Sequence, residues 1–327
     1  MTAPNGEPIL KVRNLVTQLK GKRGTGRAVN GVSFDLHAGE TLGLVGESGS
    51  GKSLTCLSVL RLNPRPASNI QAGEVLFDGE DLLKKTDSQM RQYRGKQISM
   101  ILQDPMRALN PVLTIGDQLF ESLRLHKQLG GTALRDAASG LLERVHIPNP
   151  TQGLSAYPHH FSGGMRQRVV GAIAMAGSPR VLIADEPTTA LDVTVQAAFL
   201  DLLKRIQQEA GLAILFVTHD FAVVARMCDR VAVMYAGRIV ETAPTADLFD
   251  SPRHPYTESL LRSVPDVDRR ENRLYSIPGQ PPSVFAPLPG CPFAPRCPKV
   301  MDRCHRELPP TRSLGDQRTV RCWLHEE

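Results

Sequence analysis

The chain has no apolar run that approaches the roughly 18 residues needed to span a bilayer. The apolar run at 169–177 is too short and predicts a buried helix. The first residues, MTAPNGEPILKV, lack the basic start and apolar core of a secretion signal. These absences exclude an integral membrane protein, and we expect a cytosolic chain that contacts a membrane only through a partner.

The sequence also lacks a strong charge of either sign. Its 39 basic and 33 acidic residues are spread along the chain and give a net charge of +6. Such a mild and dispersed excess favours a solvated surface over nucleic-acid binding. Six cysteines in a cytosolic protein do not predict a disulfide framework. Cys56 and Cys228 stand alone in apolar segments and are expected to be core residues.

Short, almost continuous apolar runs recur through the first 250 residues. They cover Thr41–Val45, Ile98–Leu102, Val181–Asp185, Ala213–Val217 and Val231–Tyr235. Runs of this kind suit strands that are covered on both faces, as in a parallel sheet. A helical pattern between two of them, from Val193 to Ile206, ends before Gly211. Alternating strands and helices predict an α/β fold.

Two stretches depart from this alternation. Residues 106–165 show helical spacing without a comparable strand, which predicts a helical insertion. After about residue 250 the chain becomes rich in proline and loses its periodicity. We therefore expect a main domain over 1–250 and a C-terminal extension over 251–327.

A complete glycine-rich phosphate loop follows the first predicted strand. It consists of Gly46, Glu47, Ser48, Gly49, Ser50, Gly51, Lys52 and Ser53. The glycines let backbone N–H groups face phosphates, and a following helix at 53–62 adds positive potential. Lys52 is expected to reach the β- and γ-phosphates, and Ser53 to bind magnesium. The alternative is a chance Gly-Ser turn, but strand, motif and helix agree.

Two carboxylates stand at the end of the strand over 181–185. Asp185 is expected near magnesium, and Glu186 is placed to polarise an attacking water. The alternative for an isolated Asp-Glu is a pair of solvated loop acids. Ser162 and the glycines Gly163 and Gly164 begin another predicted helix, and their N–H groups form a second anion site.

This combination resembles the ATP-binding subunits of ABC transporters, and the resemblance covers nearly the whole chain. It implies a P-loop ATPase domain with a RecA-like core, an antiparallel β part and a helical subdomain at about 106–165. It also implies ATP and Mg²⁺ as ligands. In this family two such domains pair head to tail, and each ATP lies between the phosphate loop of one chain and the signature of the other.

The resemblance assigns roles to several further residues. The signature is carried by Ser162, Gly163, Gly164 and Met165, where Met165 replaces the commoner glutamine. Gln103 resembles the glutamine that touches magnesium and the water, or is otherwise a surface turn residue. His219 resembles the histidine that senses the γ-phosphate, or is otherwise structural. Asp192 matches the D-loop aspartate.

Further motifs resemble one branch of the family. They are ILQDPMRALNP at 101–111, FSGGMRQRV at 161–169, ADEPTTALDVTVQ at 184–196 and HPYT at 254–257. They are similar to dipeptide and oligopeptide permease subunits, a branch that also includes nickel, opine and sugar importers. The resemblance implies a peripheral protein on the cytoplasmic face of the bacterial inner membrane. Its partners would be a paralogous ATPase or a second copy, two permease subunits and an extracytoplasmic solute-binding protein.

The remaining cysteines, Cys291, Cys297, Cys304 and Cys322, are separated by intervals of five, six and seventeen residues. Four thiols in a reduced chain suggest a soft-metal site. The spacing is typical neither of zinc pairs nor of ferredoxins, so zinc, a 4Fe-4S cluster and free thiols all stay open. Resemblance to the peptide-permease subunits favours a structural 4Fe-4S cluster, which we expect to lie remote from ATP.

One family feature is missing. Family members usually stack an aromatic ring on adenine from a loop before the phosphate loop, but no Phe, Tyr or Trp precedes Phe34. The guanidinium of Arg23 or Arg27 could stack instead. Two other functions stay open. A soluble ABC protein of translation or DNA repair would usually carry paired domains or a coiled coil, and a metal-dependent regulator would not need Glu186 and His219.

Overall fold

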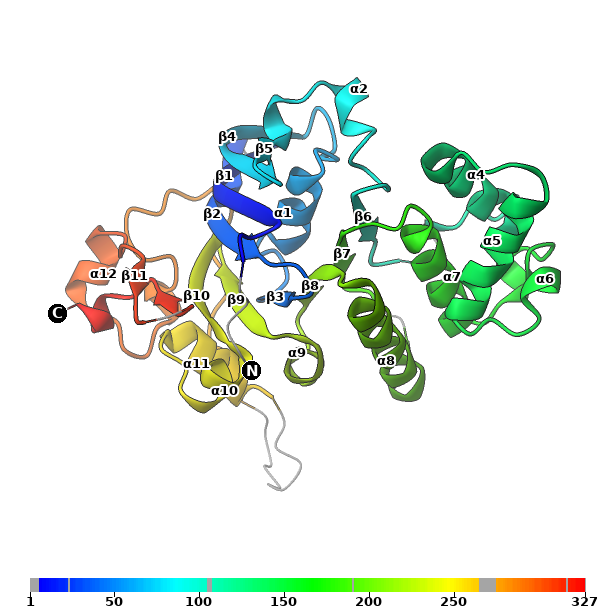
Figure 1. Cartoon of the computed structure of the whole chain (residues 1–327). Coiled ribbons are helices and arrows are strands. Elements are labelled where there is room, and N and C mark those ends of the chain that lie inside the picture. Colours follow the sequence, from blue (N-terminus) through cyan, green and yellow to red (C-terminus); the bar gives the residue numbers. More distant parts are fainter. Residues whose placement is uncertain are drawn as a thin grey trace. The chain divides into compact units, whose positions relative to one another are not determined.

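The computed structural model describes residues 6–22, 24–104, 108–189, 191–264, 275–315 and 317–326. The chain forms two compact units, each built from segments far apart in the sequence (Figure 1). Unit 1 comprises Met1–Ile9, Leu36–Glu40 and Lys84–Val217, and unit 2 comprises Leu10–Asp35, Thr41–Leu83 and Thr218–Glu327. The predicted domain boundary near residue 250 does not coincide with the division into these two units, and it stays a prediction.

Unit 1 contains a parallel arrangement of three buried strands. Strand β7 (Val181–Asp185) lies between β6 (Ile98–Ile101) and β8 (Ala213–Thr218). Every residue of β7 and β8 is buried. Because both faces of these strands are covered, apolar residues occupy consecutive positions instead of alternating ones. The parallel strands predicted from these runs are confirmed.

The other regular elements in the described part of unit 1 are helical. They are α2 (Asp87–Met90), α4 (Ile115–Lys127), α5 (Gly131–Arg144), α6 (Pro150–Gly153), the 3-10 turn η2 (Pro158–His160), α7 (Gly163–Met175) and α8 (Val193–Ala210). The described residues of 108–165 form helices and no strand, so the predicted helical character of this segment is confirmed. Gly211, in the left-handed conformation at φ 61°, ends α8 where the sequence predicts.

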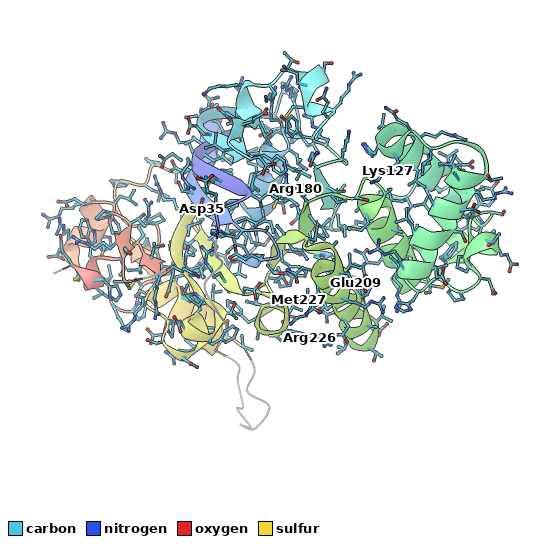
Figure 2. All side chains as sticks on the ribbon, viewed as in Figure 1. Asp35, Lys127, Arg180, Glu209, Arg226 and Met227 are labelled. Carbon is cyan, nitrogen blue, oxygen red and sulfur yellow. The ribbon has the colours of Figure 1, made fainter. Side chains whose placement is uncertain are left out.

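Side chains link the helices of this unit. Arg144 at the end of α5 lies 3.5 Å from the carboxylate of Glu209 on α8, which is labelled in Figure 2. Arg205 reaches the same carboxylate at 3.8 Å from one turn earlier. All three side chains are about half exposed, so the pairs orient the helices more than they stabilise them.

Unit 2 contains an antiparallel sheet with the strand order β2-β1-β4-β5. Its strands are β1 (Leu10–Gly21), β2 (Gly24–Leu36), β4 (Ser68–Phe77) and β5 (Glu80–Asp81), after which the 3-10 turn η1 (Leu82–Lys84) follows. Strands β1 and β4 pair antiparallel from Leu10 opposite Phe77 to Leu19 opposite Ser68. This sheet is the antiparallel part that the family resemblance implies.

A second group of strands in unit 2 has the order β11-β12-β10-β9-β3. The strands are β3 (Thr41–Val45), β9 (Arg230–Tyr235), β10 (Arg238–Pro244), β11 (Arg312–Ser313) and β12 (Thr319–Val320). Strands β3 and β9 run parallel, and β12 adds antiparallel to β10. The C-terminal extension therefore adds strands to the sheet that contains β3, the strand before the phosphate loop (Figure 1).

The helices of unit 2 are short. They are α1 (Lys52–Val59), α9 (Phe221–Met227), α10 (Thr245–Asp250), α11 (Pro255–Arg262) and α12 (Asp302–Arg306), with 3-10 turns η3 (Ala294–Arg296) and η4 (Trp323–His325). Cys56 on α1 and Cys228 after α9 are buried, as predicted for core residues. No helix in the described part of the chain combines the length and apolarity needed to cross a membrane.

The HPYT segment forms the start of α11. The Nδ1 atom of His254 accepts the N–H of Tyr256 at 3.0 Å, so this histidine is a helix cap. The buried carboxylate of Glu241 on β10 accepts the N–H groups of Arg253 and His254, both at 2.8 Å. Burial lowers the pKa of His254 to about 3, so the ring is neutral at physiological pH and can act as this acceptor.

Candidate functional site

The phosphate loop joins β3 to α1 within unit 2 and is packed against neighbouring backbone. A Cβ atom on Gly46, at φ 152°, would lie 2.1 Å from the carbonyl oxygen of Met234. One on Gly51, at φ 106°, would lie 2.4 Å from the carbonyl oxygen of Ala28. Only glycine fits these positions, because the close approach and the positive φ both exclude a side chain. The loop is therefore shaped before any ligand binds.

Lys52 is the buried cation of this loop. Its side chain is 5% exposed, and Nζ donates to the carbonyl oxygens of Gly46 at 2.7 Å and Glu47 at 3.0 Å. The ammonium group therefore lies along the inside of the loop, among the backbone groups that the sequence assigns to the phosphates. A compact cation with rotatable donors can exchange these carbonyl contacts for phosphate oxygens.

Glu47, the second residue of the loop, is held by the C-terminal extension. Its carboxylate accepts two hydrogen bonds from Arg296 on η3, at 2.7 and 2.9 Å. This hydrogen bonding raises the pKa of the Arg296 guanidinium. Arg296 directly precedes Cys297, so the segment that carries the cysteines contacts the predicted phosphate loop through this pair. The expectation that a bound cluster lies remote from ATP stays a prediction.

Unit 1 brings two of the predicted catalytic residues together. The amide Nε2 of Gln103, after β6, donates to the Glu186 carboxylate at 3.0 Å. The Thr189 hydroxyl donates to the same carboxylate at 3.1 Å. Glu186 has a φ of 46°, and its N–H donates to the carbonyl oxygen of Val217 on β8. Backbone strain at a polar residue marks a site where side-chain direction is fixed at some energetic cost.

Asp185, the last residue of β7, is 5% exposed. It comes from the buried end of a parallel strand, where a carboxylate can face a ligand at the edge of the sheet. His219 follows β8, belongs to unit 2 and is exposed. Its neighbour Asp220 caps α9 by accepting the N–H groups of Ala222 and Val223.

The signature residues begin α7 in unit 1. Ser162 is the N-cap and its hydroxyl accepts the N–H of Met165 at 3.4 Å. Gly163 starts the helix, and no atom lies within 4 Å of where its Cβ would be. These residues leave free space over a helix N-terminus, which suits an anion.

The D-loop aspartate is tied to the same region of unit 1. Asp192 caps α8 by accepting the N–H of Val195 at 3.0 Å. A Cβ atom on Gly164 would lie 2.3 Å from the side chain of Val195, so the start of α7 packs directly on the start of α8. Asp192 and the signature therefore lie at the starts of two helices that pack on each other.

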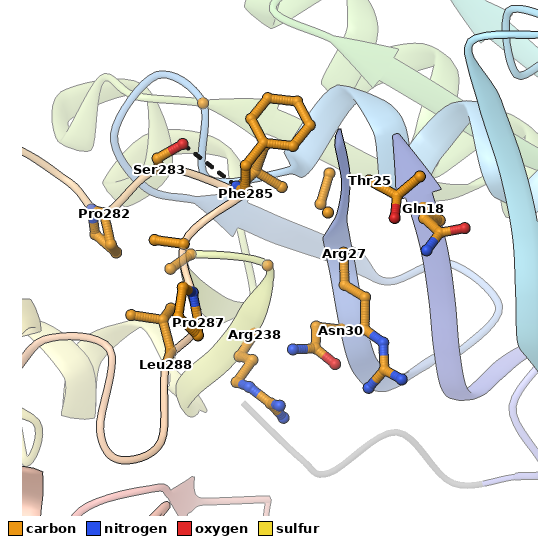
Figure 3. A pocket seen from close by; sticks show the side chains of 17 residues that line it. Gln18, Thr25, Arg27, Asn30, Arg238, Pro282, Ser283, Phe285, Pro287 and Leu288 are labelled. Atoms are coloured by element: carbon orange, nitrogen blue, oxygen red, sulfur yellow. Dashed lines mark hydrogen bonds between the residues drawn. The ribbon is translucent and has the colours of Figure 1, made fainter. Parts of the chain in front are cut away.

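A cavity of about 450 Å³ lies beside the phosphate loop in unit 2 (Figure 3). Gly49 lines it together with Gln18 of β1, Arg27 of β2 and the proline-rich segment at 282–288. Phe285 and Arg27 come from different walls of this cavity (Figure 3). The cavity thus offers an aromatic ring and a guanidinium next to a loop that binds phosphates.

Two glycines of the β1/β2 hairpin allow Phe285 to reach this place. A Cβ on Gly21 would lie 2.8 Å from the Phe285 ring, and one on Gly26 would lie 2.1 Å from the carbonyl oxygen of Val284. Of the arginines considered for stacking, Arg27 lines the cavity, and Arg23 lies outside the described residues. An aromatic side chain from far downstream in the chain therefore lines the cavity beside the predicted phosphate loop.

The four C-terminal cysteines lie near one another. The N–H of Cys291 donates to the carbonyl oxygen of Cys304 at 2.7 Å, and both side chains pack with Trp323. Burial, helped by the neighbouring Cys304, Cys322 and Cys297, raises the pKa of Cys291 to about 11. Among the described residues, however, no group of three or more His, Cys, Asp or Glu side chains is arranged to hold a metal ion.

Comparison with known proteins decides the family. A family model described as ABC transporter matches residues 29–189, and one described as oligopeptide/dipeptide transporter, C-terminal region, matches residues 240–304. The dipeptide transport ATP-binding protein DppD of Bacillus subtilis (strain 168) is 50% identical over 321 residues, covering 98% of this chain and 96% of the relative. The chain belongs to the ABC transporter ATP-binding proteins of the dipeptide/oligopeptide branch.

Other relatives agree with this membership. The oligopeptide transport ATP-binding protein OppD of the same organism is 47% identical over 317 residues, covering 97% of this chain and 88% of the relative. A dimeric ATP-binding cassette in a post-hydrolysis state with ADP and Pi superimposes with a TM-score of 0.65 at 26% identity, covering 72% of this chain and 98% of that one. The chain is thus an ABC-type ATPase coupled to transport, as its motifs predict.

Two residues of the site were missed by sequence reasoning. Phe285 and Arg296 lie in a proline-rich region without periodicity, where no pattern indicates a function. A signal for Arg296 was nevertheless present. Glu47 is an acidic residue inside a loop that binds anions, and such a charge requires a cationic partner from elsewhere in the chain.

Proposed function

We propose that this protein is the ATP-hydrolysing subunit of an importer of dipeptides and oligopeptides. The main support is the 50% identity with the dipeptide transport protein DppD, which extends over 98% of this chain. The match to the oligopeptide/dipeptide transporter C-terminal region agrees with it. The protein would lie on the cytoplasmic face of the inner membrane, bound to two permease subunits and a paralogous ATPase or a second copy. An extracytoplasmic protein would deliver the peptide.

We propose the roles in hydrolysis that the family resemblance assigns to these residues. Lys52 and the N–H groups of the phosphate loop bind the phosphates, while Ser53 and Asp185 hold magnesium. Glu186 polarises the attacking water, and its 3.0 Å hydrogen bond from Gln103 fixes the direction of the carboxylate. His219 senses the γ-phosphate. Catalysis is then mainly positioning and electrostatic stabilisation.

Transport assays test the proposed substrate class. In vesicles reconstituted with the permease subunits, the partner ATPase and the solute-binding protein, we expect ATP inside to drive uptake of labelled dipeptides. Nickel and opines should neither be taken up nor compete. Nickel uptake without peptide uptake would assign the chain to another importer of the same branch. ATPase activity independent of any permease would instead favour a soluble ABC protein.

We propose that the cavity beside Gly49 holds the adenine base. Phe285 supplies the aromatic surface that the upstream loop lacks, and Arg27 supplies a guanidinium from another wall. A base–aromatic stack suits a half-exposed ring such as Phe285, because the hairpin holds the tip of the ring near Gly21 while part of the side chain stays accessible. The C-terminal extension would then contribute to base binding.

Phe285→Ala is expected to weaken ATP binding about tenfold, which corresponds to the loss of one base–aromatic stack. Binding of inorganic tripolyphosphate should not change, because this probe has no base. Phe285→Tyr should keep the affinity for ATP. Isothermal titration of the full chain measures all three. Equal losses for ATP and tripolyphosphate would contradict the base assignment and indicate damage to the phosphate loop.

We propose further that Cys291, Cys297, Cys304 and Cys322 bind a structural 4Fe-4S cluster. Support comes from the family resemblance, from the hydrogen bond between the Cys291 N–H and the Cys304 carbonyl oxygen, and from the small apolar core that both residues share with Trp323. Metal binding would supply folding free energy to this segment. The bound group would stabilise the extension and take no part in hydrolysis.

Anaerobically purified protein should then be brown and carry about four irons per chain. Cys304→Ser should bleach it and increase proteolysis of the extension, whereas Cys56→Ser should keep its colour. Metal analysis and absorption spectra measure this. A colourless anaerobic preparation with one zinc per chain would show that the four cysteines bind zinc instead of an iron–sulfur cluster. A preparation without metal would show that they are free thiols.

A further inference from the structure

Arg296 neutralises a negative charge in the phosphate loop. Glu47 places a carboxylate at the second position of a loop whose ligand is strongly anionic. Left alone, this charge would repel phosphates. The paired guanidinium of Arg296 neutralises the carboxylate through two hydrogen bonds of 2.7 and 2.9 Å.

Arg296 is itself fixed by the extension and the sheet. Its side chain is 4% exposed. Nε donates to the carbonyl oxygen of Pro278 at 2.9 Å, and Nη2 also reaches that of Ile277 at 3.4 Å. Nη1 donates in addition to the Tyr235 hydroxyl at 3.2 Å. All N–H groups of the guanidinium therefore have partners, and its orientation toward Glu47 is determined.

The contact reaches the phosphate-binding backbone through Glu47. The N–H of Glu47 donates to the buried hydroxyl of Tyr256 at 2.9 Å, while its carbonyl oxygen accepts Lys52 Nζ at 3.0 Å. The same carbonyl accepts the N–H of Ser50 at 3.2 Å. Arg296 thus holds the side chain of Glu47, and the backbone carbonyl of Glu47 accepts a hydrogen bond from Lys52, the lysine expected to bind the phosphates.

A cluster of packed aromatic rings supports Arg296 and Tyr256, the two residues that hold Glu47. The Tyr256 ring lies 4.5 Å from that of Tyr235 and 5.3 Å from that of Phe293, measured between centroids. Phe293 directly precedes η3 and is 1% exposed. Because close-packed rings resist displacement, this cluster holds the start of η3 against the residues that contact the phosphate loop.

We propose that Arg296 is a positioning residue of the ATPase, which orients and neutralises Glu47 so that the affinity for ATP depends on the C-terminal extension. The proposal rests on the nucleotide site described above. Lysine cannot substitute, because its single ammonium group cannot make the paired hydrogen bonds to the carboxylate. The extension is then a component of the nucleotide site.

Arg296→Met in the full chain is expected to weaken ATP binding about tenfold, the effect of losing a bidentate charged pair. In the assembled transporter, KM for ATP should rise by a similar factor while kcat at saturating ATP stays nearly unchanged. Arg296→Lys should recover only part of the affinity. Arg306→Met, an exposed arginine on α12, is the matched control and should bind ATP like the wild type.

A second substitution separates the proposed role from simple stabilisation of the extension. Adding Glu47→Gln to Arg296→Met removes the unpaired carboxylate, so the affinity for ATP should recover about threefold relative to the single variant. If Arg296 only stabilised the extension, the added substitution would recover nothing. Either that result or wild-type ATP affinity in Arg296→Met overturns the proposal.

Lys52→Ala shows whether the nucleotide site itself is correctly assigned. If Lys52→Ala abolishes ATP binding and Arg296→Met does not change it, the nucleotide site stands and the role of Arg296 fails. If Lys52→Ala binds ATP like the wild type, the assignment of the phosphate loop fails, and with it the basis of the proposal. The two failures are therefore distinguishable in one set of titrations.

Discussion

Glu186→Gln should bind ATP as tightly as the wild type but lose ATP hydrolysis in the assembled transporter, by about a hundredfold or more. The amide keeps the size and the hydrogen-bonding positions of the side chain, so the contacts with Gln103 and Thr189 can persist. It cannot accept a proton from the attacking water. Because ATP binds and is not consumed, the chain should accumulate as an ATP-bound dimer.

Phosphate release and size-exclusion chromatography with ATP measure the two effects. Glu143→Gln makes the same chemical change at an exposed residue of α5 and should hydrolyse ATP at the wild-type rate. Near-normal hydrolysis by Glu186→Gln in the complete transporter would refute the assignment. Loss of ATP binding would instead mean that Glu186 supports the structure around β7.

The fold could be predicted because its strands carry a strong local signal. Strands β7 and β8 are buried on both faces, so their sequences are unbroken apolar runs that no surface segment imitates. Strands β11 and β12 have two residues each and exist only because β10 offers an edge to pair with. A pattern of two residues carries no periodicity, so the extension of the sheet could not be found from the sequence.

The site shows the same difference between residues with a local sequence signal and residues that only folding brings together. The phosphate loop, Asp185 and the signature are continuous motifs whose chemistry can be worked out from neighbours along the chain. The ion pair between Arg296 and Glu47 joins positions 249 residues apart. Such a partner is defined by folding alone, although the unusual acid in the loop indicates that one must exist.

Ser162→Arg should abolish ATP hydrolysis in the assembled transporter while ATP binding to the isolated chain stays unchanged. The isolated chain binds ATP through its own phosphate loop in unit 2, whereas Ser162 begins α7 in unit 1. If the signature completes the site of the partner, the open space over Gly163 is where the partner's ATP enters. An arginine at the N-cap also removes the hydroxyl that accepts the N–H of Met165.

The double variant Glu186→Gln, Ser162→Arg gives the clearest result. Glu186→Gln alone should elute as a dimer with ATP, and adding Ser162→Arg should return it to a monomer, because the second anion site no longer receives the partner's ATP. Ser155→Arg, an exposed serine before the signature, introduces the same charge and should leave the ATP-bound dimer intact. A double variant that still dimerises with ATP would show that the signature does not contact nucleotide, and each chain would then hydrolyse ATP without its partner.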